Sequence, residues 1–85
     1  MNLLERATRR NGATILKHLR RQRGLTQTQL GRRTGVSRAR ISTLETERSE
    51  LTVTEWRTLC RDFNLSLGLI CLNPRQLLAS LRRAG

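Results

Sequence analysis

The sequence predicts a small, mainly all-α domain, a compact bundle of four to five helices with one short candidate strand near the carboxyl end. Apolar residues recur at intervals of three and four in several short runs, which is the period of an amphipathic helix. Two capping boxes mark helix starts, and Gly35 separates two of the runs at the spacing of a helix-turn-helix corner. The chain has 85 residues, so a single domain over residues 1–85 is expected.

Two helices are expected before the corner. Residues 2–10 form the first, and Asn11-Gly12 is expected to interrupt it. The second spans about residues 13–23 and ends at Gly24, a residue suited to the left-handed backbone of a helix end. Its apolar stripe consists of Ile15, Leu16 and Leu19.

The corner itself is predicted over residues 26–45. Thr26 and Gln29 form a capping box that begins a short helix, and Gly35 ends it. Ser37 can cap the next helix, which runs to about Glu45. Only about three residues separate the two helices, which is the length of a helix-turn-helix turn.

A supporting helix follows, and the segment after it is harder to assign. Thr52 and Glu55 form the second capping box and begin a helix that ends near Asn64. Its core face repeats at three and four residues through Val53, Trp56, Leu59, Cys60 and Phe63.

Residues 65–72 alternate as a strand would, and we favour a strand over a helix that carries Gly68 inside it. Nothing else in the chain offers a partner strand, so the same segment of a second copy is the simplest partner. The expected dimer contacts come from Leu65, Leu67, Leu69 and Cys71. Asn73-Pro74 then begins a basic helix over residues 74–83.

The charge predicts a polyanionic partner. There are 17 basic and 6 acidic residues, a net charge of +11, and all basic residues except Lys17 are arginine. A surface kept only for solubility would mix both signs. With only Trp56 and Phe63 as aromatic residues, stacking on single-stranded RNA is disfavoured. No apolar run approaches a membrane span and no secretory signal is visible, so we expect a cytoplasmic, nucleoid-associated protein.

No catalytic or metal site is predicted, and no cofactor is expected. Cys60 and Cys71 are isolated, and His18, expected at the surface, is the only histidine, so a set of three or four zinc ligands is lacking. We expect both cysteines to be buried, reduced thiols. No nucleophile–base pair or phosphate-binding glycine loop is present, so the chain is not expected to be an enzyme.

A helix-turn-helix places its second helix in the major groove of duplex DNA. If Ile41 and Leu44 face the core, the outward side chains are available to read bases, and the arginine in the first turn can fork onto a guanine edge. The base-reading candidates are Arg38, Ala39, Ser42 and Thr43. The candidates for phosphate or groove-edge contacts are Thr26, Gln27, Ser37, Arg40, Arg21 and Arg33.

The stretch LRRQRGLTQTQLGRRTGVSRARISTLE carries a resemblance over residues 13–65. It resembles the Cro/C1-type (Xre-like) helix-turn-helix domains of phage repressors and bacterial regulators, which have the lambda-repressor-like fold. The resemblance implies that Gln27 and Arg38 pair near the groove edge, and that Arg20 and Glu45 form a partly buried ion pair. Gly31 stands where the family usually has alanine, and ETERSE replaces a shorter loop that contains glycine.

The end of the match, RDFNLSLGLICL, resembles HipB-like antitoxins, in which a strand pairs across the dimer. That resemblance implies an autorepressing antitoxin that also neutralises a HipA-like kinase toxin. The expected function is therefore sequence-specific binding of double-stranded DNA by a homodimeric repressor on an inverted-repeat operator. The alternatives are a stand-alone phage-type repressor, and an adaptor or antitoxin for which DNA binding is secondary.

Overall fold

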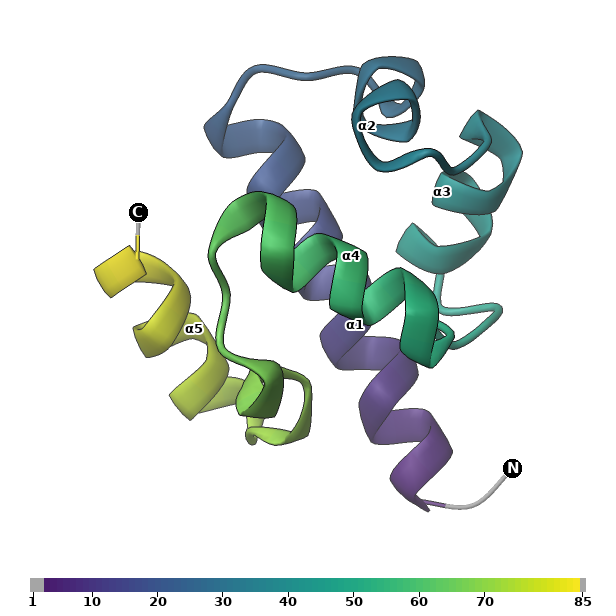
Figure 1. Cartoon of the computed structure of the whole chain (residues 1–85). Helices are drawn as coiled ribbons and strands as arrows, with labels where there is room; N and C mark the ends of the chain where they lie inside the picture. Colours follow the sequence, from purple (N-terminus) through teal and green to yellow (C-terminus); the bar gives the residue numbers. More distant parts are fainter. Residues whose placement is uncertain (1–2, 85) are drawn as a thin grey trace.

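The computed structural model describes residues 3–84 (Figure 1). Every regular element in this range is a helix, which confirms the all-α class. The elements are α1 (Leu3–Gln22), α2 (Gln27–Thr34), α3 (Arg38–Glu45), α4 (Val53–Phe63), the short 3-10 helix η1 (Leu67–Cys71) and α5 (Pro74–Ala84).

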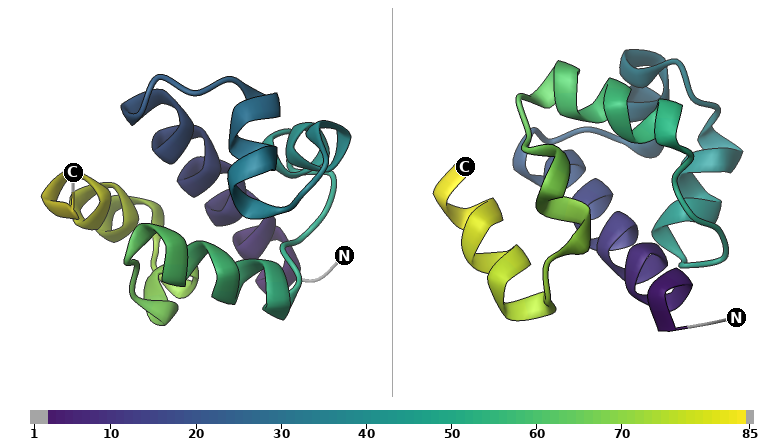
Figure 2. Two further views of the ribbon diagram at one scale, coloured as in Figure 1. Left: turned by 45° about the horizontal axis from the view of Figure 1, so that its top comes forward. Right: turned by 60° about the horizontal axis from the view of Figure 1, so that its bottom comes forward.

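The long helix α1 is the centre of the arrangement. The helix α3 packs on one side of it and α5 on the other, α2 packs on α3 and α4, and α4 and η1 close the front (Figures 1 and 2). One buried core joins all of them, because each helix contributes buried apolar side chains to it. The prediction that Val53 belongs to the core face of α4 is wrong: Val53 is the first residue of the helix and is exposed, and Trp56, Leu59, Cys60 and Phe63 form that face. The largest buried aliphatic side chains are Ile15, Leu16, Leu30, Ile41, Leu44, Leu77 and Leu81.

The predicted break at Asn11-Gly12 is wrong, because both residues lie inside α1. Asn11 is only 1 % exposed, and its amide nitrogen donates to the carbonyl oxygens of Ile70 at 2.8 Å and Leu72 at 2.7 Å. Gly12 lies against Leu51, whose Cδ1 atom would be 3.3 Å from a Cβ atom placed on the glycine. The pair therefore lets other segments dock closely on α1 and does not end the helix.

The predicted strand at residues 65–72 is also wrong, since the chain forms η1 there. Local bonds satisfy its backbone: the Leu69 amide donates to the Ser66 carbonyl at 3.1 Å, and the Leu72 amide to the Leu69 carbonyl at 3.3 Å. The Trp56 indole nitrogen donates to the Leu67 carbonyl oxygen at 2.9 Å. With these groups and the Asn11 contacts satisfied inside one chain, this segment needs no pairing strand.

The four side chains expected to pair across a dimer do not share a face. Leu67 is 60 % exposed, Leu69 is 7 % exposed within the core, Leu65 is half-buried and Cys71 is exposed. A dimer that pairs strands at residues 65–72 is therefore excluded, because the segment forms no strand. The resemblance to HipB-like antitoxins depended on the same strand and loses its support with it.

The cysteines differ from each other. Cys60 is buried in the core face of α4, and burial raises the pKa of its thiol. Cys71 is exposed at the end of η1, so the expectation that both thiols are buried was wrong for Cys71. Both are free cysteines.

The predicted ends of the last two helices are confirmed. The Thr52 hydroxyl accepts from the Glu55 amide at 3.0 Å, the Glu55 carboxylate accepts from the Thr52 amide at 2.8 Å, and Asn64 ends α4 in the left-handed region. At α5, the Asn73 side chain accepts from the Gln76 amide at 2.8 Å, and Pro74 is the first helical residue. None of the helices in the described range combines the length and the apolar character that crossing a bilayer requires.

Candidate nucleic-acid interface

The helix-turn-helix forms where the capping residues predict it. Thr26 and Gln29 make both bonds of the capping box, at 3.1 and 2.8 Å, and Ser37 accepts from the Arg40 amide at 3.1 Å. Gly35 ends α2 with φ of 73°, a left-handed conformation that is strained for residues with a Cβ atom. These local contacts fix where α2 ends and where α3 begins.

A close approach fixes the angle between α2 and α3. Leu30 on α2 packs against Ile41 and Leu44 on α3, and all three are buried. Gly31 lies directly beneath the turn, and a Cβ atom at this position would overlap the carbonyl oxygen of Val36. In this chain the turn backbone occupies the space that a methyl group at position 31 would need, so glycine fits here.

The outward face of α3 carries the four base-reading candidates together. Arg38 and Ala39 are exposed, and Ser42 and Thr43 are partly exposed. The Thr43 hydroxyl donates to the Ala39 carbonyl at 2.9 Å, which leaves its oxygen free to accept. Within residues 3–84, the guanidinium of Arg38 makes no hydrogen bond or ion pair.

Arg20 and Glu45 join α1 to α3 at the start of α2. The guanidinium donates twice, at 2.9 and 3.0 Å, to a carboxylate whose side chain is 5 % exposed. This hydrogen bonding raises the pKa of Arg20 above its ordinary value. Gln27 also donates to Glu45 at 3.4 Å. Gln27 therefore contacts the Arg20–Glu45 ion pair, and the pairing of Gln27 with Arg38 that the resemblance implied does not form in the described residues.

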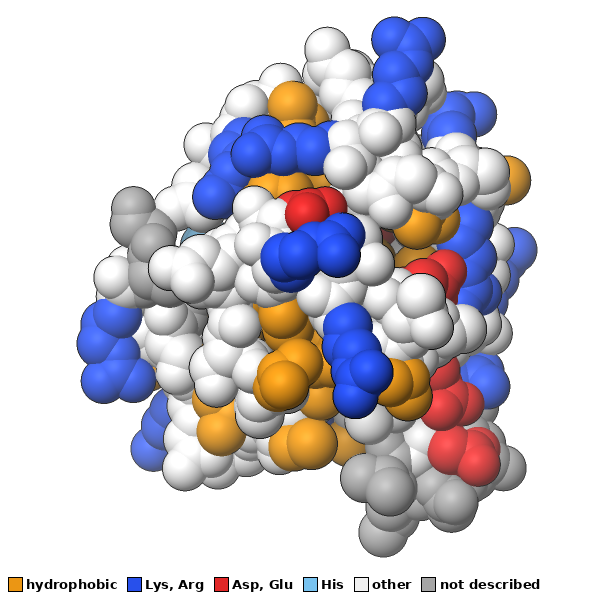
Figure 3. All heavy atoms as spheres, viewed as in Figure 1, with side chains coloured by type: hydrophobic (Ala, Val, Ile, Leu, Met, Phe, Trp, Pro, Cys, Tyr) orange, Lys and Arg blue, Asp and Glu red, His pale blue; other side chains and the backbone are white. Residues whose placement is uncertain are grey.

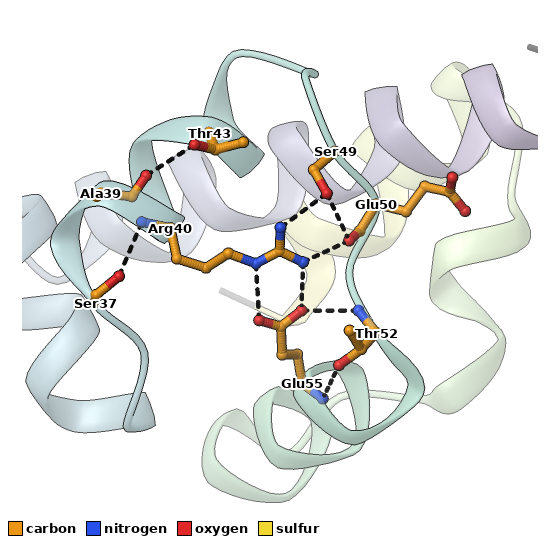
Figure 4. Close-up of polar contacts among 8 residues, drawn as sticks. All are labelled: Ser37, Ala39, Arg40, Thr43, Ser49, Glu50, Thr52 and Glu55. Carbon is orange, nitrogen blue, oxygen red and sulfur yellow. Dashed lines mark hydrogen bonds and ion pairs between the residues drawn. The ribbon is translucent and has the colours of Figure 1, made fainter.

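Arg40 points away from the outward face and joins α3 to α4 (Figure 4). Its Nε and Nη2 atoms donate to the two carboxylate oxygens of Glu55 at 3.0 and 2.8 Å. It also donates to the Ser49 hydroxyl and the Glu50 carbonyl, each at 2.8 Å. These bonds raise the pKa of Arg40 and lower that of Glu55. The Arg40 guanidinium, which was expected to contact a phosphate or a base, is therefore bonded to groups of the domain itself.

The remaining predicted cations lie in two different places. The guanidinium of Arg33 is 4.9 Å from the centre of the Phe63 ring, and that of Arg23 is 4.6 Å from it, so both stack on α4. Arg21 is exposed on α1, beside a surface hollow of about 580 Å³ that Lys17 and His18 also line. The structure therefore does not bring Arg33 and Arg21 together with the outward face of α3.

Sequence reasoning missed two contacts. Arg40 precedes the core residue Leu44 by four positions, and this helical spacing could have placed it at the edge of the core. The second contact is made by Arg9, which donates to the Arg48 carbonyl at 3.1 Å and to Glu50 at 3.5 Å. No sequence signal identifies that contact, because 39 residues separate Arg9 from Arg48.

Comparisons with known proteins agree with this geometry. Residues 16–70, well over half of the chain, match the family HTH_3, described as helix-turn-helix. Comparison with curated proteins and with solved structures found no match. The chain thus belongs to the Cro/C1-type helix-turn-helix family of DNA-binding regulatory domains.

Proposed function

We propose that the chain is a sequence-specific regulator of transcription that binds double-stranded DNA and acts as a repressor. The observation that carries the proposal is Arg38. It is exposed in the first turn of α3 without a partner in the described range, while Arg40, two residues later, is held by Glu55. A free guanidinium at the start of a recognition helix is placed to fork onto the major-groove edge of guanine.

The neighbouring side chains suit the other groups in the groove. Ala39 offers a methyl group to the methyl of thymine, and Ser42 and Thr43 offer hydroxyl oxygens. At the backbone, the first turns of α2 and α3 direct free amides outward beside Thr26, Gln27 and Ser37, where a phosphate is favoured. Arg21 adds a phosphate contact from α1, so Arg21→Ala should weaken binding to all duplexes alike. Such a regulator works at the nucleoid, in the cytoplasm.

Selection from a pool of random duplexes tests this function and identifies the preferred sequence at the same time. The recovered duplex and a scrambled version are then compared at 150 mM salt. We expect a preference of about a thousandfold or more for the selected sequence. Equal affinities that fall steeply with salt would show only non-specific attraction to phosphate and would refute the proposal.

A homodimer is the second part of the proposal. Two half-sites of an operator require two recognition helices. Exposed apolar side chains gather over η1 and the start of α4 (Figure 3), where Val53 is 70 % exposed and Leu67 is 60 % exposed. We call Val53 and Leu67 the apolar patch. The Trp56 indole, one turn after Val53, donates to the Leu67 carbonyl, so the start of α4 and η1, which carry the patch residues, are joined by a hydrogen bond.

Sedimentation of Leu67→Arg tests the dimer. We expect a monomer with the thermal stability of the wild type, whereas Leu78→Arg, a change at an exposed leucine outside the patch, should leave the dimer intact. Leu69 is unsuitable, because a charge in the core would unfold the domain. A monomeric wild type would contradict the homodimer and would favour the alternative in which the patch binds another protein, such as a HipA-like toxin.

A further inference from the structure

We propose that the outer face of α1 is an additional phosphate-binding surface, which follows the DNA backbone beyond the bases read by α3. The proposal rests on the DNA-binding function proposed above and extends its contact area. The surface consists of Arg6, Arg10, Lys17 and Arg21, which we call the α1 stripe. Arg6 and Arg10 precede the part of the chain that matches the helix-turn-helix family, so the first half of the stripe lies outside that match.

The spacing places the stripe on one side of the helix. Intervals of four, seven and four residues return to nearly the same direction around an α-helix. Arg6, Arg10 and Arg21 are exposed, and Lys17 is partly exposed. From Arg6 to Arg21 the helix rises about 22 Å, at roughly 1.5 Å per residue. Measured along the duplex axis, at about 3.4 Å per nucleotide of one strand, this length corresponds to about six nucleotides.

No ion pair within residues 3–84 uses a residue of the stripe, since the pairs formed there use Arg9, Arg20, Arg40 and Arg61. The stripe side chains also make no hydrogen bond within this range. A surface kept only for solubility would interleave acidic residues with these four. Their charge is therefore available to a polyanion.

Two contacts hold the stripe rigidly against the helix-turn-helix. Towards the end of α1, Arg20 pairs with Glu45 of α3. In the first half of α1, Arg9 donates to the Arg48 carbonyl in the loop that follows α3. The first turns of α1 lie beside this loop in both orientations of Figure 2. A stripe joined to α3 at one end and to the loop that follows α3 at the other keeps its register on the duplex.

Two surface hollows along the stripe offer room for phosphate groups. One of about 260 Å³ is lined by Arg6, Arg9 and Arg10, with Glu47 as its acidic residue. The other, of about 580 Å³, is lined by Thr14, Lys17, His18, Arg21, Gln22 and Leu78. The His18 Nε2 atom is buried without a hydrogen-bond partner, and the Thr14 hydroxyl lies between the basic residues. Both hollows are open, as contacts to a passing backbone require.

The test compares Arg6→Gln/Arg10→Gln with the control Arg75→Gln/Arg82→Gln. Both remove two exposed arginines that make no ion pair in the described structure, but the control residues lie on α5, on the other side of α1 from α3 (Figure 1). Each variant is titrated against the selected duplex, once trimmed to the bases that α3 reads and once with about ten flanking base pairs on each side.

On the long duplex, the stripe variant should lower the slope of log affinity against log salt by about 2 for each bound chain, since each phosphate contact contributes about 0.9. Between 50 and 200 mM salt it should therefore lose about tenfold less affinity than the wild type. On the trimmed duplex the stripe variant, the control and the wild type should have equal slopes, and base preference should not change.

Wild-type slopes for the stripe variant on the long duplex, or an equal decrease for the control, would overturn the stripe alone. A wild type with no base preference on either duplex would overturn the stripe and the proposed function together. A thermal unfolding midpoint for each variant shows that folding is intact.

Discussion

Arg38 and Arg40 are two residues apart in α3, and their surroundings give them different tasks. The helical turn directs Arg40 towards α4, where Glu55 binds both of its forked donors, and Ser49 and Glu50 accept further bonds. Arg38 has no such neighbour and remains exposed. One arginine therefore stabilises the position of α3, and the other is available to a ligand.

The Arg40–Glu55 pair makes stability depend on pH. Arg40 holds the pKa of Glu55 below its ordinary value, so the ionised carboxylate stabilises the folded chain above a pH of about 4.3. This stabilisation is lost as the pH falls through the lower, folded-state pKa. We expect Glu55→Gln to cost about 1–2 kcal/mol at pH 7 and the difference from the wild type to shrink below about pH 4. Urea unfolding of both proteins between pH 3 and 8 measures this difference in unfolding free energy.

Asp62→Asn is the control for this prediction. Asp62 contacts Arg61 at 3.5 Å, and the Arg61 side chain is largely exposed, so the change should alter stability by less than about 0.5 kcal/mol. A Glu55→Gln penalty that stays constant down to pH 3 would show that the carboxylate charge does not stabilise the fold.

Glu47 has a backbone conformation that glycine would adopt more easily. Its φ of 62° lies in the left-handed region, within the loop where the resembled family commonly has glycine. We expect Glu47→Gly to stabilise the chain by about 0.5–1 kcal/mol in thermal unfolding. Asn64→Gly is the comparison: its φ is 55°, but asparagine tolerates this region, so the gain should be smaller. A Glu47→Gly variant less stable than the wild type would show that the backbone of Glu47 is not strained.

At the scale of elements, the helix boundaries that depend on local chemistry were predictable from the sequence. The helices capped by Thr26, Ser37 and Thr52 begin where the sequence predicts them. A capping bond reaches only three residues along the chain, so a local pattern is enough to identify it. The two errors, at Asn11-Gly12 and at residues 65–72, share one cause. Asn11 lies inside α1 and donates to carbonyl groups 59 and 61 residues away, and this long-range contact, which no local pattern contains, holds η1 against α1.

Asn11 is therefore a test of how η1 is held. In Asn11→Ala the carbonyl groups of Ile70 and Leu72 would lose their donor, so we expect a loss of about 2–3 kcal/mol in unfolding free energy. Hydrogen exchange in η1 should accelerate more than in α3. Thr14→Ala, which removes only a bond to the backbone of its own helix, should cost far less. Equal penalties would contradict the role assigned to Asn11.

Gly31 tests the contact between α2 and α3. Alanine normally stabilises a helix by about 1 kcal/mol relative to glycine. Here its methyl group would overlap the Val36 carbonyl oxygen. Because this oxygen belongs to the backbone of a tight turn, it cannot move away easily. We expect Gly31→Ala to destabilise the chain by about 1–3 kcal/mol in urea unfolding. Gly68→Ala, at a site with no atom near the added methyl group, is the control. A stabilised Gly31→Ala variant would contradict this packing.

At the scale of the whole molecule, the acidic residues serve the fold and the basic residues dominate the surface. Glu45, Glu50, Glu55 and Asp62, four of the six acidic residues, are paired with arginines. Most of the net charge of +11 is therefore displayed outward. Such a surface attracts a polyanion from every side, so charge alone gives affinity for DNA without selectivity.

In the proposed function, selectivity comes from the few side chains on the outward face of α3. Helical periodicity alone predicted that Arg38, Ala39, Ser42 and Thr43 share this face, since Ile41 and Leu44 face the core. It did not predict the positions of Arg40 and Arg33, because their partners, Glu55 and Phe63, lie on α4. Which arginines are free depends on tertiary contacts that no local pattern contains.

The most direct test of the account is the affinity of Arg38→Ala, with Arg75→Ala as the control, for the selected duplex and its single base-pair substitutions. We expect Arg38→Ala to lose about 1–3 kcal/mol on the selected duplex and to become indifferent to one base pair, while it keeps the wild-type affinity for random DNA. Arg75→Ala should keep the wild-type preference at every position. If Arg38→Ala instead loses affinity equally on selected and random duplexes, Arg38 contacts phosphate and α3 does not read bases through it.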